Sequence, residues 1–333
     1  MPTLDDVARE VGVHPSTVSR ALNPQKAVMV NPQTRQAVEQ AARKLGYRPH
    51  MVARGLQSGR TATVGVIAAD LGNPFVTPII HGITESLEVA EMMPVVAETQ
   101  DEHDRFARIL DHMLSRRVDA VVAAATRAGD RRILEDASRI APVVIAGRPL
   151  PGSTLPQAVL DDGAGARMAA EHLHQLGHRH VVQLRGPLDV ANFQYRAEAF
   201  TQASRDLGLR EVELPEIGTR PILEEGRRLM GALLDRGEGV PSAVFAHNDL
   251  MAMGALAVLR EAGRRVPQDV SLIGYNDLPM MDLVDPPLTT IRYRSREIGL
   301  AAGRLVVEVL SGSNPPSVCL EPSLVIRAST LSC

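Results

Sequence analysis

The chain has 333 residues, 44% of them hydrophobic, and a formal net charge of −3, so its length suits two or three globular domains. It contains no run of eighteen apolar residues and no basic segment followed by a short apolar one. The sequence therefore predicts neither a membrane span nor a secretion signal, and we expect a cytoplasmic protein. The two cysteines, Cys319 and Cys333, lack the spacing of a metal or redox site.

The beginning of the chain predicts two short helices joined by a tight turn. Thr3 and Asp6 form a capping-box pattern at the start of the first helix, and Gly12 ends it. His14 and Pro15 open the second helix, since proline is favoured in the first helical turn. Two helices that meet through a glycine turn are typical of the helix-turn-helix motif.

The second helix carries side chains suited to reading a DNA duplex. Ser16, Thr17, Ser19 and Arg20 lie on the face opposite its apolar residues, where they can reach base edges and phosphates in a major groove. A helical hairpin packed only against its own domain is the alternative. Charge favours the DNA reader, because residues 1–60 hold nine Lys and Arg against four Asp and Glu, a charge of +5 that leaves −8 on the rest of the chain.

A third helix completes the amino-terminal head. It begins at Asn31-Pro32 and ends at Gly46, so we place a DNA-binding domain at residues 1–48. Residues 49–60 are too few for a stable isolated helix, and Gly55 weakens one further. We expect a linker that becomes helical only on DNA.

From residue 61 onward, short apolar runs alternate with helical patterns. The expected strands are Thr63–Ala69, Pro94–Glu98, Asp119–Ala124, Pro142–Ala146 and Gln157–Leu160, followed by His180–Leu184, Val240–Ala246 and Asp269–Gly274. Buried β runs between helices predict an α/β fold with two similar lobes, each a doubly wound parallel sheet. A ligand crevice is expected between the lobes, at the carboxyl ends of the strands.

Ordered motifs recur over nearly the whole chain. They include Gly12-Val13-x-x-x-Thr17-Val18-Ser19-Arg20-x-Leu22-Asn23, Leu45-Gly46-Tyr47-x-Pro49, Ala53-Arg54-x-Leu56, Asn73-Pro74-Phe75, Asn248-Asp249-x-Met251-Ala252 and Pro287-Leu288-Thr289-Thr290-Ile291. In these motifs the chain resembles the lactose-repressor/galactose-repressor (LacI/GalR) family of bacterial transcription regulators. The resemblance implies a helix-turn-helix head, a hinge helix at 49–60 and a body at 61–333 like periplasmic sugar-binding proteins, usually in a homodimer. We expect lobe 1 at about 61–159 and 289–320 and lobe 2 at about 160–288 and 321–333.

The resemblance also assigns positions that contact a pseudo-palindromic double-stranded operator. These are Thr3, Pro15, Ser16, Thr17, Ser19, Arg20, Asn23, Arg35, Tyr47, Ala53, Arg54 and Leu56. Pro15 and Ser16 match the pair that chooses the operator sequence, and Leu56 matches the leucine that paired hinge helices wedge between base steps. Because proline has no side-chain donor, Ser16, Arg20 and DNA shape must supply much of the choice.

For the effector crevice, the implied residues come from both lobes. They are Phe75, Ala124, Arg148, Arg196, Pro221, Asn248, Asn276 and Arg294. Arg196 is the favoured anchor because a guanidinium fork can hold paired hydroxyls or a carboxylate, although a surface helix charge is the alternative. The expected effector is a sugar or a sugar-derived metabolite. Arg148 and Arg294 are expected to face the mouth, which leaves a sugar acid, a phosphorylated sugar or a small polar metabolite open.

Other chemistry finds little support in the sequence. The run from His172 to His180 holds four histidines, but no acid or cysteine completes a tetrahedral metal set. No nucleophile elbow or phosphate-binding loop occurs, so we expect no metal, no cofactor and no enzyme. The predicted function is a sequence-specific repressor whose operator affinity a small effector controls. An activator of the same family and a solute-binding protein of a transport system are the alternatives.

Overall fold

The computed structural model describes residues 2–22, 26–47, 60–237 and 240–333. The chain divides into two compact units, Met1–Thr61 and Ala62–Cys333, called here the head and the body. None of the helices in the described ranges is long and apolar enough to cross a membrane.

The head is a small helical unit built around its helix-turn-helix. Its elements are α1 (Leu4–Val11), α2 (Pro15–Ala21), the 3-10 turn η1 (Ala27–Met29) and α3 (Pro32–Leu45). Thr3 caps α1 through a reciprocal capping box, and Gly12, at a φ of 71°, lets the chain turn toward α2. Val7, Val18 and Val38, one from each helix, are fully buried together. The predicted helix-turn-helix is confirmed.

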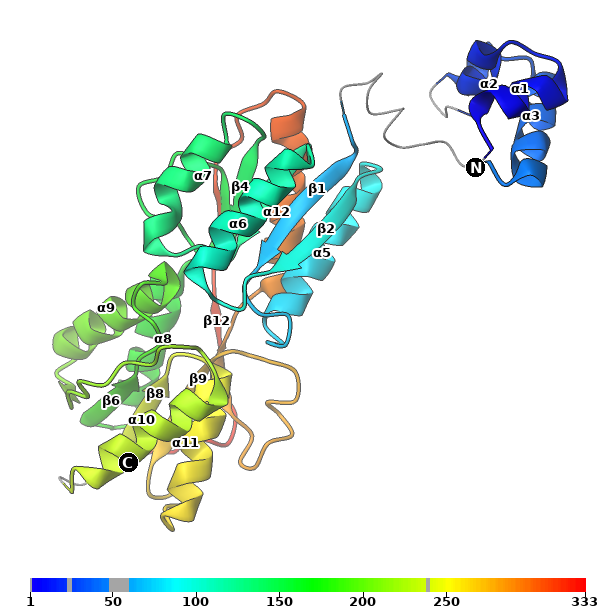
Figure 1. Cartoon of the computed structure of the whole chain (residues 1–333). Helices are drawn as coiled ribbons and strands as arrows, with labels where there is room; N and C mark the ends of the chain where they lie inside the picture. The colour runs from blue at the N-terminus through cyan, green and yellow to red at the C-terminus, as the bar shows by residue number, and fades with distance from the viewer. Residues whose placement is uncertain (1, 23–25, 48–59, 238–239) are drawn as a thin grey trace. The chain divides into compact units, whose positions relative to one another are not determined.

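The body contains two six-stranded sheets, one in each lobe (Figure 1). Lobe 1 has β1 (Thr63–Ala68), β2 (Met93–Glu98), β3 (Ala120–Ala124), β4 (Val143–Ala146), β5 (Gln157–Leu160) and β11 (Val318–Leu320), in the order β11-β5-β4-β3-β1-β2. Lobe 2 has β6 (His180–Leu184), β7 (Arg210–Glu211), β8 (Ala243–Ala246), β9 (Ser271–Asn276), β10 (Thr289–Arg292) and β12 (Ser323–Val325), in the order β12-β10-β9-β8-β6-β7. All pairs are parallel except β10 with β12, which is antiparallel.

Helices cover both faces of each sheet, as the predicted doubly wound fold requires. In lobe 1 they are α5 (Val76–Val89), α6 (His103–Ser115), η2 (Ala128–Asp130), α7 (Arg131–Ala137) and α12 (Ser295–Leu310). In lobe 2 they are α8 (Asp162–Gln175), α9 (Ala191–Asp206), α10 (Leu223–Asp235) and α11 (Asp249–Glu261). The α5–α12 and α6–α7 pairs pack on opposite faces of the first sheet, and the α8–α9 and α10–α11 pairs do so on the second.

One helix pair in each lobe packs backbone to backbone through glycines. In lobe 1, a Cβ added to Gly299 on α12 would lie 2.1 Å from the carbonyl oxygen of Ile79 on α5. In lobe 2, a Cβ added to Gly254 on α11 would lie 2.1 Å from the carbonyl oxygen of Leu223 on α10. Glycine at these positions therefore permits both close helix contacts.

The chain crosses between the lobes at three points, from β5 to α8, from β10 to α12 and from β11 to β12. Strand β10 corrects the expected lobe boundary at residue 289, because it pairs with β9 in the sheet of lobe 2. Thr290 also ties β10 to that lobe, since its hydroxyl donates to Asp249 Oδ1 at 2.6 Å. The second crossing therefore follows Arg292.

Candidate functional site

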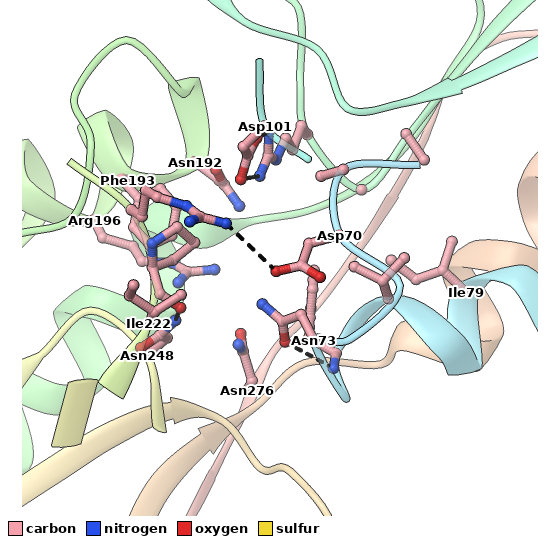
Figure 2. Close-up of a pocket in the computed structure, with 18 residues that line it drawn as sticks. Asp70, Asn73, Ile79, Asp101, Asn192, Phe193, Arg196, Ile222, Asn248 and Asn276 are labelled. Atoms are coloured by element: carbon pink, nitrogen blue, oxygen red, sulfur yellow. Dashed lines mark hydrogen bonds and ion pairs between the residues drawn. The ribbon is translucent and has the colours of Figure 1, made fainter. Parts of the chain in front are cut away.

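Loops at the carboxyl ends of the strands enclose one cavity between the lobes, as expected for this topology (Figure 2). Lobe 1 contributes Asp70, Asn73, Phe75, Asp101, Ala124, Gly147 and Arg148, and lobe 2 contributes Asn192, Phe193, Arg196, Arg220, Pro221, Ile222, Asn248 and Asn276. Figure 2 shows Asp70, Asn192 and Asn276 directed toward the shared space. A ligand in this cavity would contact both lobes at once.

Seven of the eight residues expected in the crevice line this cavity. They are Phe75, Ala124, Arg148, Arg196, Pro221, Asn248 and Asn276. Arg294 does not line it, which corrects that expectation. It immediately precedes α12 in a separate outer groove, and its Nε lies 3.4 Å from Glu297 Oε1 because the two are one helical turn apart.

Arg196 lies inside the lobe rather than on its surface, which excludes the surface-charge alternative. Its side chain is 1% exposed, and its Nε donates to Asp162 Oδ1 at 2.8 Å. The guanidinium carbon lies 3.6 Å from the ring centroid of Tyr275, and Nη1 donates to the carbonyl oxygen of His247. Complete burial raises the pKa of Asp162 to about 6, although Arg196 opposes that shift.

A second ion pair lies in the wall of lobe 1. Arg148 donates to both carboxylate oxygens of Asp101, at 2.6 and 3.0 Å, and Arg127 lies 3.4 Å from the same carboxylate. Burial alone would raise the pKa of Asp101, but the two arginines hold it below its usual value. Across the cavity, Arg220 of lobe 2 lies 3.9 Å from Asp70 of lobe 1.

Four asparagines supply the neutral polar groups of the cavity. Both polar side-chain atoms of Asn248 have partners within lobe 2, because its Nδ2 donates to the carbonyl oxygen of Pro221 at 2.8 Å and its Oδ1 accepts the N–H of Met251 at 2.7 Å. Asn73 accepts the N–H of Phe75 at 3.0 Å. Among the described residues, the buried Oδ1 atoms of Asn192 and Asn276 have no hydrogen-bond partner. Such acceptors require donors, which a polar ligand can supply.

Several cavity residues were given no individual role from the sequence. Asp70, Asn73 and Asn192 lie in segments 70–75 and 185–196, which follow expected strands and are therefore expected at the crevice, and all three line the cavity. Asp101 also follows an expected strand, Pro94–Glu98, but was not assigned to the crevice, and Arg220 follows no expected strand. They lie in loops that reach the cavity only through the folded arrangement of both lobes.

On the head, the residues expected to contact DNA differ in their exposure, and some lie outside the described residues. Ser16 and Arg20 are exposed on α2, whereas Pro15, Thr17 and Ser19 are half-buried. The remaining described positions have partners within the head, since Thr3 donates to Asp6 at 2.8 Å, Arg35 lies 3.7 Å from Glu39, and Tyr47 packs on the head core. Asn23, Ala53, Arg54 and Leu56 lie outside the described residues, and their roles stay predictions.

The histidine run has ordinary structural contacts. The Nε2 atom of His172 lies 3.1 Å from Thr330 Oγ1, and His178 lies between the hydroxyls of Ser242 and Ser271 at 2.9 and 3.0 Å. Within the described ranges, no group of three His, Cys, Asp or Glu side chains could hold a metal ion.

Known proteins resemble this chain over nearly its whole length. The head matches the bacterial regulatory proteins of the lacI family over residues 3–50, and the body matches a periplasmic binding protein-like domain over residues 170–330. The HTH-type transcriptional repressor CytR of Escherichia coli strain K12 is 32% identical over 332 residues, 98% of this chain and 96% of its own. The HTH-type transcriptional regulator CelR of Thermobifida fusca is 33% identical over 341 residues, 98% of each chain.

Solved structures agree with these matches. The Lac repressor dimer bound to operator and the anti-inducer ONPF superposes with a TM-score of 0.91 at 27% identity, over 99% of each chain. The complex of the regulator CelR with cellobiose gives a TM-score of 0.74 at 31% identity, over 99% of this chain and 100% of that one. The chain therefore belongs to the lacI family of bacterial regulatory proteins rather than to a family of enzymes.

Proposed function

We propose that this chain is a cytoplasmic transcriptional repressor that binds a pseudo-palindromic operator as a homodimer, and that a small effector in the cavity controls its DNA affinity. The observation that carries the proposal is the cavity itself, because its polar walls come from both lobes. A ligand that contacts both lobes binds some lobe arrangements better than others, and only such a difference can shift an equilibrium linked to DNA. The repressor CytR and the operator-bound Lac repressor support the DNA-binding half of the proposal.

The charges of the cavity favour an uncharged effector. Each of its three arginines has a carboxylate partner: Arg148 has Asp101, Arg196 has Asp162, and Arg220 has Asp70. The orphaned oxygens of Asn192 and Asn276 would repel an anion and accept hydrogen bonds from hydroxyls. We therefore propose a neutral sugar over a sugar acid or a sugar phosphate. The cellobiose complex of CelR agrees with this choice.

The homodimer is supported by the outer edge of lobe 1. Strand β2 ends the sheet order, and two apolar side chains, Val89 at the end of α5 and Met93 at the start of β2, are 87% and 65% exposed. An unpaired strand edge with exposed apolar residues is a surface that a second chain can cover. The Lac repressor structure, which is a dimer, fits the same proposal.

The test combines DNA selection with a ligand screen on the full chain. Selection from a random duplex library should yield a two-fold symmetric sequence, and affinity for it should fall steeply with salt. Neutral sugars, sugar acids and sugar phosphates are then screened by thermal shift, where a ligand at a hundred times its dissociation constant stabilises by about 2.7 kcal/mol. We expect a neutral sugar to raise the melting temperature and to change operator affinity.

Two results would contradict the proposal. If the chain selects no duplex sequence, the proposed repressor function is contradicted. Stabilisation by acids or phosphates alone would leave the repressor in place but remove the neutral-effector assignment, and Asn276→Ala would then leave binding intact instead of weakening it.

A further inference from the structure

The body contains a second cavity, which shares no lining residue with the cavity lined by Arg196, called here the effector cavity. The volume of the second cavity is about 750 Å³, within the range of cavities that hold small molecules. Lobe 1 contributes the loop 149–152 and parts of β5 and β11, and lobe 2 contributes α8 and α9. A ligand in the second cavity would therefore also contact both lobes.

The most buried polar side chain in the lining of the second cavity is Asp162, which is 0% exposed. Its Oδ1 accepts the Nε–H of Arg196 at 2.8 Å, and its Oδ2 has no hydrogen-bond partner among the described residues. The hydroxyl of Tyr275 does not supply the missing donor, because it donates to the main-chain oxygen of Asp162 at 3.3 Å. A buried carboxylate oxygen without a donor costs free energy, which a ligand that donates to it can recover.

The Arg196–Asp162 pair connects the linings of the two cavities. Arg196 lines the effector cavity, and Asp162 lines the second cavity. The two side chains are 2.7 Å apart between Nη2 and Oδ1. A donor that binds Oδ2 would therefore share one carboxylate with the arginine of the effector cavity.

The lining of the second cavity is strongly acidic. Its five carboxyl side chains are Asp161, Asp162, Glu171, Glu198 and Asp206. The only cationic side chain among the described residues of the lining is Arg167, which lies 3.8 Å from Asp161. Glu198 and Asp206 accept hydrogen bonds from the amides of Gln194 and Gln202, which carry no charge. This lining attracts a cation and repels an anion.

The other walls of the second cavity favour an organic cation over a metal ion. Leu150 and Leu160 of lobe 1 and Ala199 and Leu207 of lobe 2 present apolar surface, and the ring of Tyr195 can contact a cation through its face. In the part of the chain that the structure describes, these carboxylates form no group of three that could hold a metal ion. An ammonium group on a hydrocarbon body matches both the acidic and the apolar parts of the lining.

We propose that the second cavity is a binding site for a small organic cation, whose ammonium group donates to Asp162 Oδ2 and whose hydrocarbon body packs on the apolar walls. A protonated amine has three N–H donors, so it can bond Oδ2 and an outer carboxylate at the same time. The site does not depend on the proposed function. It adds a cationic ligand to the neutral one proposed for the effector cavity.

The first experiment compares amines with alcohols of the same skeleton on the full-length chain. Phenethylamine and tryptamine are titrated by ligand-observed NMR against phenethyl alcohol and tryptophol. The pH is kept above the value of about 6 to which burial raises the pKa of Asp162, so that the carboxyl is ionised. We expect each amine to bind about ten- to a hundredfold more tightly than its alcohol, the value of a hydrogen bond between charged groups.

Asp162→Asn tests the residue that holds the cation. The variant keeps the size of the side chain but removes its charge, so the preference for amine over alcohol should fall to near unity. Asp249→Asn is the matched control, because Asp249 is also fully buried in lobe 2 but its two oxygens already accept hydrogen bonds from Thr290 and the N–H of Leu278. The control should leave the preference unchanged.

The second experiment locates the ligand and needs no change at Asp162. The exposed thiol of Cys319 belongs to the lining, and in a Cys333→Ser chain it is the only thiol left. Phenethylamine should slow the alkylation of this thiol by iodoacetamide in proportion to its occupancy. Phenethyl alcohol at the same concentration should not slow it.

Three results would overturn the inference. Equal affinity for amines and alcohols would remove the cation as the ligand. Amine binding that leaves the alkylation rate of Cys319 unchanged would place the amine outside the second cavity. A folded Asp162→Asn chain that keeps the preference for amines would show that Asp162 does not hold the ammonium group.

Discussion

Each lobe holds one arginine–aspartate pair at the shared cavity, and the pKa of the aspartate is shifted in opposite directions in the two pairs. In lobe 1, Asp101 has two arginines, and its pKa is lowered despite burial. In lobe 2, Asp162 has Arg196 alone and no exposure, and its pKa is raised to about 6. The direction of the pKa shift therefore depends on the number of cations near the carboxylate, which lower the pKa, and on its loss of water, which raises it.

The largest expected effect comes from removing the single cation of lobe 2. Arg196→Met leaves the Asp162 carboxyl buried without its partner, so we expect the free energy of unfolding in urea to fall by about 3–5 kcal/mol. Arg148→Met should cost clearly less, because Arg127 still lies beside Asp101. The double variant Arg196→Met with Asp162→Asn should recover much of the loss. Equal losses for the two single variants would contradict the comparison.

The next largest effect is expected at a feature that both lobes share, the close helix contacts through glycine. Gly299→Ala in lobe 1 and Gly254→Ala in lobe 2 each place a methyl group against a carbonyl oxygen, so each should cost about 1–3 kcal/mol in urea unfolding. Gly231→Ala is the matched control, because a Cβ on this helical glycine of α10 meets nothing within 4 Å. That variant should stabilise by about 0.4–1 kcal/mol. A neutral result at Gly254 would show that α10 and α11 can separate without cost.

The pH dependence should also distinguish the two kinds of carboxyl. Burial raises the pKa of Asp249 to about 7 and that of Asp162 to about 6, from an ordinary value of 3.8. The folded chain then binds more protons than the unfolded chain between about pH 4 and 7. Stability should therefore fall as pH rises through this window, by up to about 1.4 kcal/mol per pH unit for each carboxyl.

The variant that isolates this effect is Asp249→Asn, whose amide can meet the same Thr290 hydroxyl and Leu278 N–H. It should flatten the upper part of the curve of unfolding free energy against pH. Asp101→Asn should leave the slope between pH 5 and 7 unchanged, because a lowered pKa contributes stability that is lost only as pH falls below about 4. An unchanged slope in Asp249→Asn would remove this carboxyl as the cause.

The smallest effect is expected where charges meet across the cavity. Arg220 and Asp70 are 3.9 Å apart, and their side chains are 48% and 29% exposed. Arg220→Gln should change the free energy of unfolding by less than about 1 kcal/mol. A larger loss would show that this contact holds the lobes together as firmly as the buried pair stabilises lobe 2.

Much of the fold could be predicted because buried strands are continuous apolar runs. The expected strand at Asp119–Ala124 forms at Ala120–Ala124, and the one expected at Asp269–Gly274 forms at Ser271–Asn276. Strand β10 was assigned to the wrong lobe because its partner, β9, is fixed by tertiary pairing that periodicity does not reveal. The chain order alone gives no sign of which sheet such a short strand joins.

The site was less predictable than the fold. The family motifs identified Arg196, but nothing in the sequence marks Asp162 as its partner, since 34 residues separate them. Asp101 was missed although it follows β2, because its role depends on Arg148, 47 residues away, which donates two hydrogen bonds to it. Long-range pairing between charges therefore had to come from the structure.

The edge positions of the last two strands limit where the chain can be truncated. Strand β11 borders the sheet of lobe 1 and β12 borders that of lobe 2, with only Glu321 and Pro322 between them. A truncation just after α12 would expose fresh β edges in both halves of the body at once, and such edges invite aggregation. The carboxyl-terminal segment therefore covers one edge of each sheet, and a shortened form of the protein should retain both strands.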